Sequence, residues 1–328
     1  MKAKRRTLLV MVVLIVLMGA AFALLTRQNE KTAQAESEAA DGTIPLAAVS
    51  AEELTRIRIT YQGETNTLDY TDGGWSLEED PAYHLDSSTC NTMLTALSSF
   101  NAKRELTPQA GEDYGFDAPA VTVEVTAAGQ TDVYTFGASN SVTGDLYVRK
   151  NDAETLYTVS GSKASCFEVA KEDLFGAFQP AGLTTSAIES VTYTMADGET
   201  VTLKANSEPV ADSETDSESA SDGTAYQTVW RLADDPTADL NQTRVDAILS
   251  ALSSYASAQI TEADPAEYGF DTPSVTATVT TADGAVTVTY AVGTDGCYLM
   301  TEGDDSIYTV DSNVISNLLV TAEQLKTE

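Results

Sequence analysis

The second half of this 328-residue chain repeats the motifs of its first half in the same order. Trp-Ser-Leu-Glu-Glu-Asp-Pro at 75–81 returns as Trp-Arg-Leu-Ala-Asp-Asp-Pro at 230–236, and Tyr-Gly-Phe-Asp-Ala-Pro at 114–119 returns as Tyr-Gly-Phe-Asp-Thr-Pro at 268–273. Two shorter motifs also recur, so that all four offsets lie between 151 and 155 residues: 96–100 at 251–255, and 156–159 at 307–310. Spacing this constant predicts two homologous domains in tandem, each of ordinary domain size.

Hydrophobic periodicity predicts that each copy is an α+β domain of mostly antiparallel strands with one or two helices. Segments such as Ile57–Tyr61 and Val121–Thr126 alternate apolar and polar residues, as half-buried strands do. One helix per copy shows apolar residues at helical spacing: Cys90, Met93, Leu94, Leu97 and Phe100, and then Val245, Ile248, Leu249, Leu252 and Tyr255.

The ends of these helices can also be predicted. Asp86 and Asn241 stand at equivalent positions before the helices, and both residue types cap helix N-termini. In the repeated turn, Gly115 and Gly269 can adopt positive φ. A closing helix is expected in each copy, over about 162–175 and 313–325.

The two copies differ in length near their start. Ile-Thr-Tyr at 59–61 matches Val-Thr-Tyr at 191–193 with an offset of only 132, which implies an insertion of 23 residues in the second copy. The segment 206–226 holds six acidic residues and no basic residue, so we expect a disordered acidic insert there. It lacks the spacing and central glycine of an EF-hand, which argues against a calcium site.

The charges are unevenly distributed along the chain. Asp and Glu number 50 against 18 Lys and Arg, yet residues 1–27 contain five bases and no acid. Thr7–Leu25 is an uncharged apolar run of 19 residues, long enough for a bilayer, and its basic flank predicts a cytoplasmic N-terminus. The alternative is a cleaved signal peptide, with Ala-x-Ala sites at 21–23 and 33–35.

The expected organisation is therefore a membrane-anchored chain whose domains lie outside the cell membrane. Its parts are a cytoplasmic tail (1–6), a transmembrane anchor (7–25), a polar stalk (26–44), a first repeat domain (45–178) and a second one (179–328) that carries the insert. The strongly acidic outer part also argues against a nucleic-acid partner, because binding a polyanion needs a basic surface.

Side chains that could carry chemistry do not form a recognisable motif. His84 is the single histidine and aligns with Asp239, so we expect a surface loop residue and neither a catalytic triad nor a multi-histidine metal site. Cys90, Cys166 and Cys297 lack close spacing, and Cys90 fits a buried helix face. Their disulfide state stays open.

Two sets of residues that both copies keep have a structural interpretation. Turn formation explains the aspartates beside Pro or Gly better than a pair of catalytic carboxylates does: Asp80, Asp117, Asp235 and Asp271. Core packing explains Trp75 and Trp230 better than a sugar-binding platform does. We therefore predict no catalytic, cofactor-binding or metal-binding residue, and no cofactor.

The Tyr-Gly-Phe-Asp-x-Pro turn, followed by strands that end in Leu-Tyr-Val and Leu-Tyr-Thr-Val, resembles the bacterial "domain of unknown function 4340" family over about residues 45–325. The resemblance implies an auxiliary role beside an ABC transporter of the gliding-motility or multidrug type, with the permease or a second extracytoplasmic subunit as partner. A cell-envelope module that binds glycan or peptide is the alternative, and an envelope hydrolase a weaker one. Exposed sheet edges would favour a binding protein, and a concave site with perturbed carboxylates would favour an enzyme.

Overall fold

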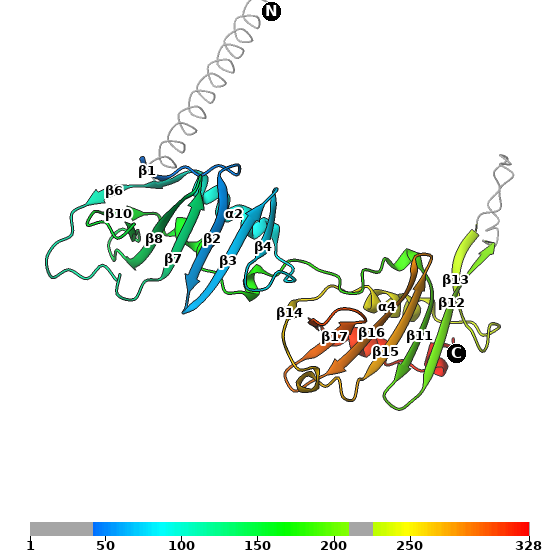
Figure 1. Cartoon of the computed structure of the whole chain (residues 1–328). Helices are drawn as coiled ribbons and strands as arrows, with labels where there is room; N and C mark the ends of the chain where they lie inside the picture. The colour runs from blue at the N-terminus through cyan, green and yellow to red at the C-terminus, as the bar shows by residue number, and fades with distance from the viewer. Residues whose placement is uncertain (1–41, 210–225, 328) are drawn as a thin grey trace, which may run out of the picture. The chain divides into compact units, whose positions relative to one another are not determined.

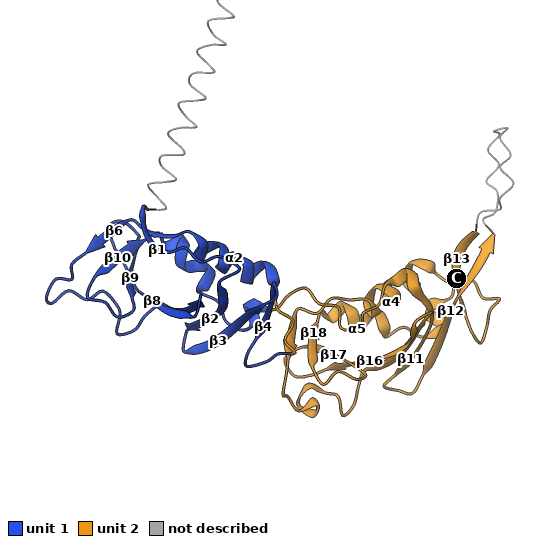
Figure 2. Ribbon diagram, turned by 45° about the horizontal axis from the view of Figure 1, so that its top comes forward, with its two compact units in different colours: residues 1–81, 87–174 blue, residues 82–86, 175–328 orange. Residues whose placement is uncertain are grey.

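The computed structural model describes residues 42–209 and 226–327, which form two compact units (Figures 1 and 2). Residues 42–81 and 87–174 belong to unit 1, and residues 82–86 and 175–327 belong to unit 2. The predicted tail, anchor and nearly all of the stalk lie outside the described residues. Within those residues, no helix is both long enough and apolar enough to cross a membrane.

Unit 1 is built on an eight-stranded antiparallel sheet with the strand order β4-β3-β2-β7-β8-β9-β10-β6. A separate strand pair joins β1 to β5. The elements are β1 (Ile44–Ala47), β2 (Leu54–Tyr61), β3 (Glu64–Thr71), β4 (Gly74–Leu77), α2 (Ser87–Ser98), β5 (Phe100–Ala102), β6 (Arg104–Leu106), β7 (Val121–Ala127), β8 (Gln130–Ser139), β9 (Leu146–Lys150), β10 (Leu156–Val159) and α3 (Gly161–Ala164).

Unit 2 repeats this topology strand for strand, with the order β13-β12-β11-β15-β16-β17-β18-β14. Its elements are β11 (Ile188–Met195), β12 (Thr200–Pro209), β13 (Tyr226–Leu232), α4 (Gln242–Leu252), β14 (Ala258–Ile260), β15 (Val275–Thr281), β16 (Gly284–Val292), β17 (Cys297–Thr301), β18 (Ile307–Val310), α5 (Ser312–Leu318) and α6 (Ala322–Leu325). The predicted class, mostly antiparallel strands with few helices in two related parts, is confirmed.

The core of each unit lies between the sheet and its helices, and Figure 2 shows α2 and α4 each against one face of the sheet. The helical periodicity is confirmed over most of its length, because Cys90, Met93 and Leu97 are buried on α2. The last apolar residue of each pattern lies outside the helix, since Phe100 belongs to β5 and Tyr255 is 65% exposed.

One of the two predicted helix caps is confirmed. The Asn241 side chain accepts a hydrogen bond from the Arg244 amide, as expected for an N-cap of α4. The closing helices are shorter than predicted. In unit 1, α3 passes into two 3-10 turns, and in unit 2, α5 and α6 are separate because the chain leaves the helix at Leu319.

Strand pairing corrects the alignment of the two copies. Ile57 pairs with Val125 and Val191 pairs with Val279, so Ile57 corresponds to Val191 and the local offset is 134, not 132. The insertion is also shorter, because Leu68 pairs with Leu77 while Leu203 pairs with Leu232, which leaves 20 extra residues instead of 23. A slip of two residues keeps every side chain on its own face of the sheet, so the sequence pattern alone did not reveal it.

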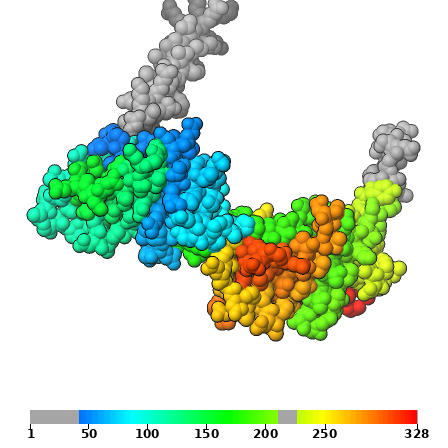
Figure 3. All heavy atoms as spheres, in the orientation of Figure 1, coloured from blue at the N-terminus to red at the C-terminus, as the bar shows by residue number. Residues whose placement is uncertain are grey.

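The prediction of a disordered insert over 206–226 is wrong at both ends of that segment. Asn206–Pro209 belong to β12 and pair with 226–229 of β13, beyond the last residue of β12 that pairs with β11. This two-stranded ribbon stands out from unit 2 (Figures 1 and 3). Backbone pairing and the ion pair between Glu208 and Arg231, 3.1 Å apart, hold it. Residues 210–225 lie outside the described residues.

A buried tyrosine allows a stability test with a natural control. Tyr290 is fully buried in the core of unit 2, burial raises its pKa, and its hydroxyl has no hydrogen-bond partner among the described residues. Its counterpart in unit 1 is Phe136, since the two pair with Val275 and Val121, respectively. Tyr290→Phe should therefore raise the free energy of unfolding by about 1 kcal/mol in chemical denaturation.

Tyr134→Phe provides the contrast. The Tyr134 hydroxyl donates a hydrogen bond to the Leu46 carbonyl at 3.1 Å, so its loss should lower the free energy of unfolding by about 1 kcal/mol. A shift of the unfolding free energy in the same direction for both substitutions would show that the missing hydrogen bond of the Tyr290 hydroxyl does not cause the effect of Tyr290→Phe.

Candidate functional site

The repeated Tyr-Gly-Phe-Asp turn packs in the same way in both units. Gly115 and Gly269 have φ of +77° and +88°, and a Cβ on either would lie 2.5 Å from the Ala138 nitrogen or 2.7 Å from the Val292 oxygen. Each turn thus lies against the end of β8 or β16. The preceding tyrosines make edge-on ring pairs, Tyr114 with Tyr147 at 4.9 Å and Tyr268 with Tyr298 at 5.0 Å.

Unit 1 has an open recess of about 580 Å³ between β9, the β9–β10 connection and the segment that follows β6. Arg149 of β9 lines it and lies over the Phe116 ring, with its guanidinium carbon 4.3 Å from the ring centre. The β9–β10 connection adds Asp152 and Glu154. The recess therefore combines one cation, an aromatic support and two carboxylates.

Unit 2 has a recess of about 670 Å³ at the matching place, with different chemistry. Met300 replaces Arg149, because the two pair with the equivalent residues Thr289 and Thr135. Phe270 and Asp304 also line this recess. Burial acts to raise the pKa of Asp304, but hydrogen bonds from Ser306 and Tyr308 outweigh it and hold that pKa below its usual value.

The second candidate surface is the outer edge of β13, an edge strand of its sheet. The Gln242 side chain accepts a hydrogen bond from the Trp230 amide at 3.1 Å and donates one to the Trp230 carbonyl at 3.2 Å. Both backbone groups of Trp230 therefore point away from β12. Because backbone direction alternates along a strand, the amide and carbonyl of Thr228 also point outward.

Beside this edge lies a groove of about 540 Å³ on the helix side of the ribbon. Trp230, Ile188 and Leu249 give it apolar walls, and Thr228 and Asp246 add polar groups. Thr228 is exposed, and within the described part of the chain its outward backbone groups have no partner. The arrangement offers an extended peptide both main-chain hydrogen bonds and a pocket for a side chain.

The sequence predicted that His84 is a surface loop residue. The structure instead places it, partly buried, in the five-residue segment 82–86 that belongs to unit 2. Its ring stacks on Phe178 with centroids 3.4 Å apart, and its backbone amide donates to the Gln259 side chain at 2.9 Å. Burial lowers its pKa, and Asp304 acts in the opposite direction. The stack gives His84 a packing role that aligning it with Asp239 could not reveal.

The cysteines and the turn aspartates that the sequence singled out have separate local environments. Cys90 is buried, Cys166 and Cys297 are partly buried, and none of the three is in a disulfide bond. Asp80 forms an ion pair with Lys171 at 2.9 Å, and Asp235 accepts a hydrogen bond from Thr237. Over residues 42–209 and 226–327, no group of three His, Cys, Asp or Glu side chains is placed to hold a metal ion.

The two tryptophans differ in environment. Trp230 is 5% exposed and belongs to the core of unit 2. Trp75 is half-buried, donates its indole hydrogen to Asn91 at 2.9 Å and lies 4.6 Å from the Tyr70 ring. Core packing is therefore right for Trp230 and only partly right for Trp75.

Sequence reasoning missed Arg149 and Gln242. Both differ between the copies, with Met300 and Ser87 at the corresponding positions, so searching for residues that the copies share passed over them. Differences between aligned copies were the signal that could have identified these residues.

These features define a class: a tandem-repeat α+β protein whose two units share one topology, with open recesses beside their strands. The family described as "Domain of unknown function (DUF4340)" matches residues 75–229 and 230–327, and the chain belongs to this family, as its motifs predicted. No curated protein and no solved structure matches the chain. Both family matches begin at a repeated tryptophan, on β4 and β13, so each is shifted along the chain relative to the structural units.

Proposed function

We propose that this protein is a membrane-anchored, extracytoplasmic accessory component of an ABC transport system that acts through contacts with other proteins. The apolar run Thr7–Leu25 supports the anchor, since its length and basic flank suit a single membrane span with the N-terminus inside. Membership of the DUF4340 family supports the transport context through the resemblance already described.

The observation that carries the proposal is the open outer edge of β13. Edge strands with unpaired backbone groups associate readily with another strand unless something blocks them. Gln242 blocks the edge at Trp230, and the exposed residues Tyr226–Thr228 continue the strand beyond it. A partner segment can add there as a further antiparallel strand.

The adjoining groove supplies selectivity to this strand addition. In an added strand, alternate side chains face the same side of the sheet, so one would point toward Ile188 and Leu249. An apolar side chain suits this wall, and Asp246 favours a basic residue beside it. We therefore expect the partner strand to carry an apolar residue with a basic neighbour.

Purification of the full-length chain from solubilised membranes tests the proposal. We expect an ABC permease, or a second extracytoplasmic subunit of the same transport system, to copurify in stoichiometric amount. A chain with the same apolar segment fused to an unrelated acidic domain controls for adhesion through the anchor. Recovery of no transport subunit, or equal recovery with the control, would contradict the proposed function.

A further inference from the structure

Arg149 stands out among the partly buried basic residues of the described chain. Partly buried cations normally need a compensating anion, because removal from water is costly. Of the seven other partly buried lysines and arginines, six have a carboxylate within 3.5 Å: Arg56, Lys103, Lys150, Lys171, Arg231 and Lys326. Within the described residues, Arg149 forms no ion pair, and its contact is with the Phe116 ring. Its missing anion can come from a ligand.

The stacking contact prepares Arg149 for this role. A guanidinium that lies over an aromatic ring uses its flat face, so its in-plane N–H donors stay available. These donors form a fork that matches the two oxygens of a carboxylate. The open recess of about 580 Å³ beside Arg149 has room for a ligand the size of a dipeptide, and Thr107 and Thr155 add polar groups to its lining.

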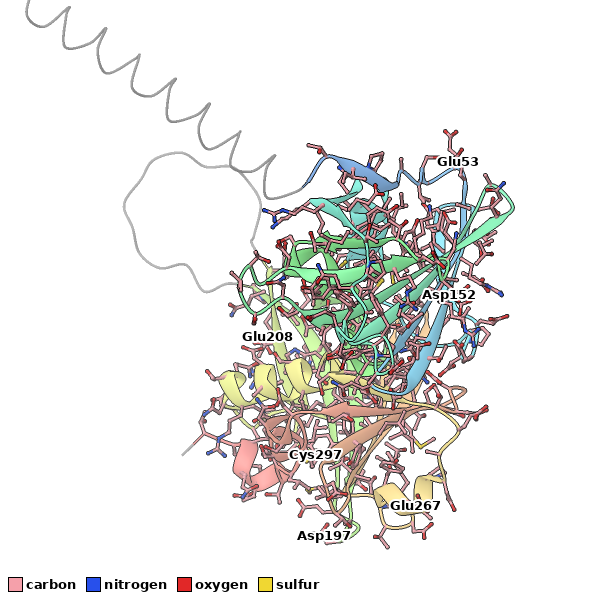
Figure 4. The ribbon with its side chains drawn as sticks, turned by 90° about the vertical axis from the view of Figure 1, so that its left-hand side faces the viewer. Glu53, Asp152, Asp197, Glu208, Glu267 and Cys297 are labelled. Carbon is pink, nitrogen blue, oxygen red and sulfur yellow. The ribbon has the colours of Figure 1, made fainter. Side chains whose placement is uncertain are left out.

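The carboxylates of the same recess are carried on a turn that is firmly attached. Asn151 donates its backbone amide to the Val133 carbonyl at 2.9 Å, and its side chain accepts from the Val133 amide at 2.7 Å. The same side chain donates to Asp132 at 2.7 Å. These bonds position the turn that presents Asp152, which Figure 4 labels, and Glu154.

From these features we propose that the recess of unit 1 binds a zwitterion, namely an amino acid or short peptide with a free carboxylate and a free ammonium group. Arg149 binds the carboxylate, and Asp152 with Glu154 binds the ammonium. A simple anion pairs only with Arg149 and a simple cation only with the two acids, whereas a zwitterion pairs with both sets of charges. This site is separate from the β13 edge and does not depend on it. Unit 2 lacks the arginine, so we expect no equivalent binding there.

Isothermal titration of the full-length chain in detergent with L-alanyl-L-alanine tests this proposal. We expect saturable binding of one dipeptide per chain. N-acetyl-L-alanyl-L-alanine, which lacks the ammonium, and L-alanyl-L-alanine amide, which lacks the carboxylate, should each bind about tenfold or more weaker. No binding of the free dipeptide, or equal binding of all three compounds, would overturn the proposal.

Variants locate the site. Arg149→Met introduces the residue of unit 2 and should weaken dipeptide binding by about tenfold to a hundredfold. The matched control Arg104→Met removes an exposed cation that does not line the recess and should leave affinity unchanged. The double variant Asp152→Asn/Glu154→Gln should lower the affinity for the dipeptide but not the affinity for its N-acetyl form. Unchanged dipeptide affinity in both recess variants would contradict the assignment.

Discussion

Gly115→Ala is expected to destabilise unit 1 by about 3 kcal/mol, because it combines left-handed backbone strain with overpacking. Gly115 has φ of +77°, and an added Cβ would lie 2.5 Å from the Ala138 nitrogen and 2.8 Å from the Ala138 Cβ. Neither of these atoms lies at the end of a flexible side chain, so the turn must shift away from β8. Urea denaturation followed by Trp75 fluorescence in a Trp230→Phe background would measure the loss in unit 1.

Gly129→Ala is the matched control for this substitution. Gly129 has nearly the same φ, +75°, but an added Cβ would have no atom within 4 Å. The control therefore isolates the backbone strain, for which we expect a loss of about 1 kcal/mol. Equal losses for the two variants would show that the close approach of the turn to β8 contributes nothing.

Trp230→Ala should cost about 3–5 kcal/mol of unfolding free energy, the usual range when a buried aromatic side chain is truncated. Trp230 is 5% exposed and packs within the core of unit 2. The Gln242 side chain bonds only to the backbone of Trp230, so the substitution leaves these hydrogen-bonding groups in place. Urea denaturation monitored by far-UV circular dichroism measures the effect without relying on tryptophan emission.

The duplicated position supplies the comparison. Trp75 corresponds to Trp230 but is only half-buried, so Trp75→Ala should cost roughly half as much. Trp230→Phe, which keeps an aromatic ring in the core, should cost less than Trp230→Ala. A larger loss for Trp75→Ala than for Trp230→Ala would contradict the assignment of Trp230 to the core.

Much of the fold could be predicted because the chain contains two homologous copies, and each element can be compared between them. Cys90 and Val245 share a helical position and are both buried, so the inward face of α2 and α4 could be read from either copy. Long strands were predictable for the same reason. The three-residue strands β5, β6 and β14 were not, because a segment this short shows no periodicity that separates it from a loop.

The candidate surfaces depend on contacts that sequence cannot place. In the recess of unit 1, Arg149 contacts Phe116. Phe116 precedes β7 and β8 in the sequence and Arg149 follows them, so only strand pairing brings the two together. At the outer edge of β13, the Gln242 side chain has to reach the backbone of Trp230. The two-residue slip at β2 and β11 shows the related limit that a period of two fixes the face but not the register.

Strand addition at β13 is the central claim, and a proline at Thr228 tests it most directly. The Thr228 amide faces away from β12, so Thr228→Pro should preserve the fold, as prolines on edge strands do, while removing the outward donor and obstructing an added strand. Thr228→Val changes the same side chain but keeps the amide. We predict that transport subunits copurify with the Thr228→Val chain and are lost from the Thr228→Pro chain, with circular dichroism unchanged in both. Equal recovery with the two variants would contradict partner binding through this edge.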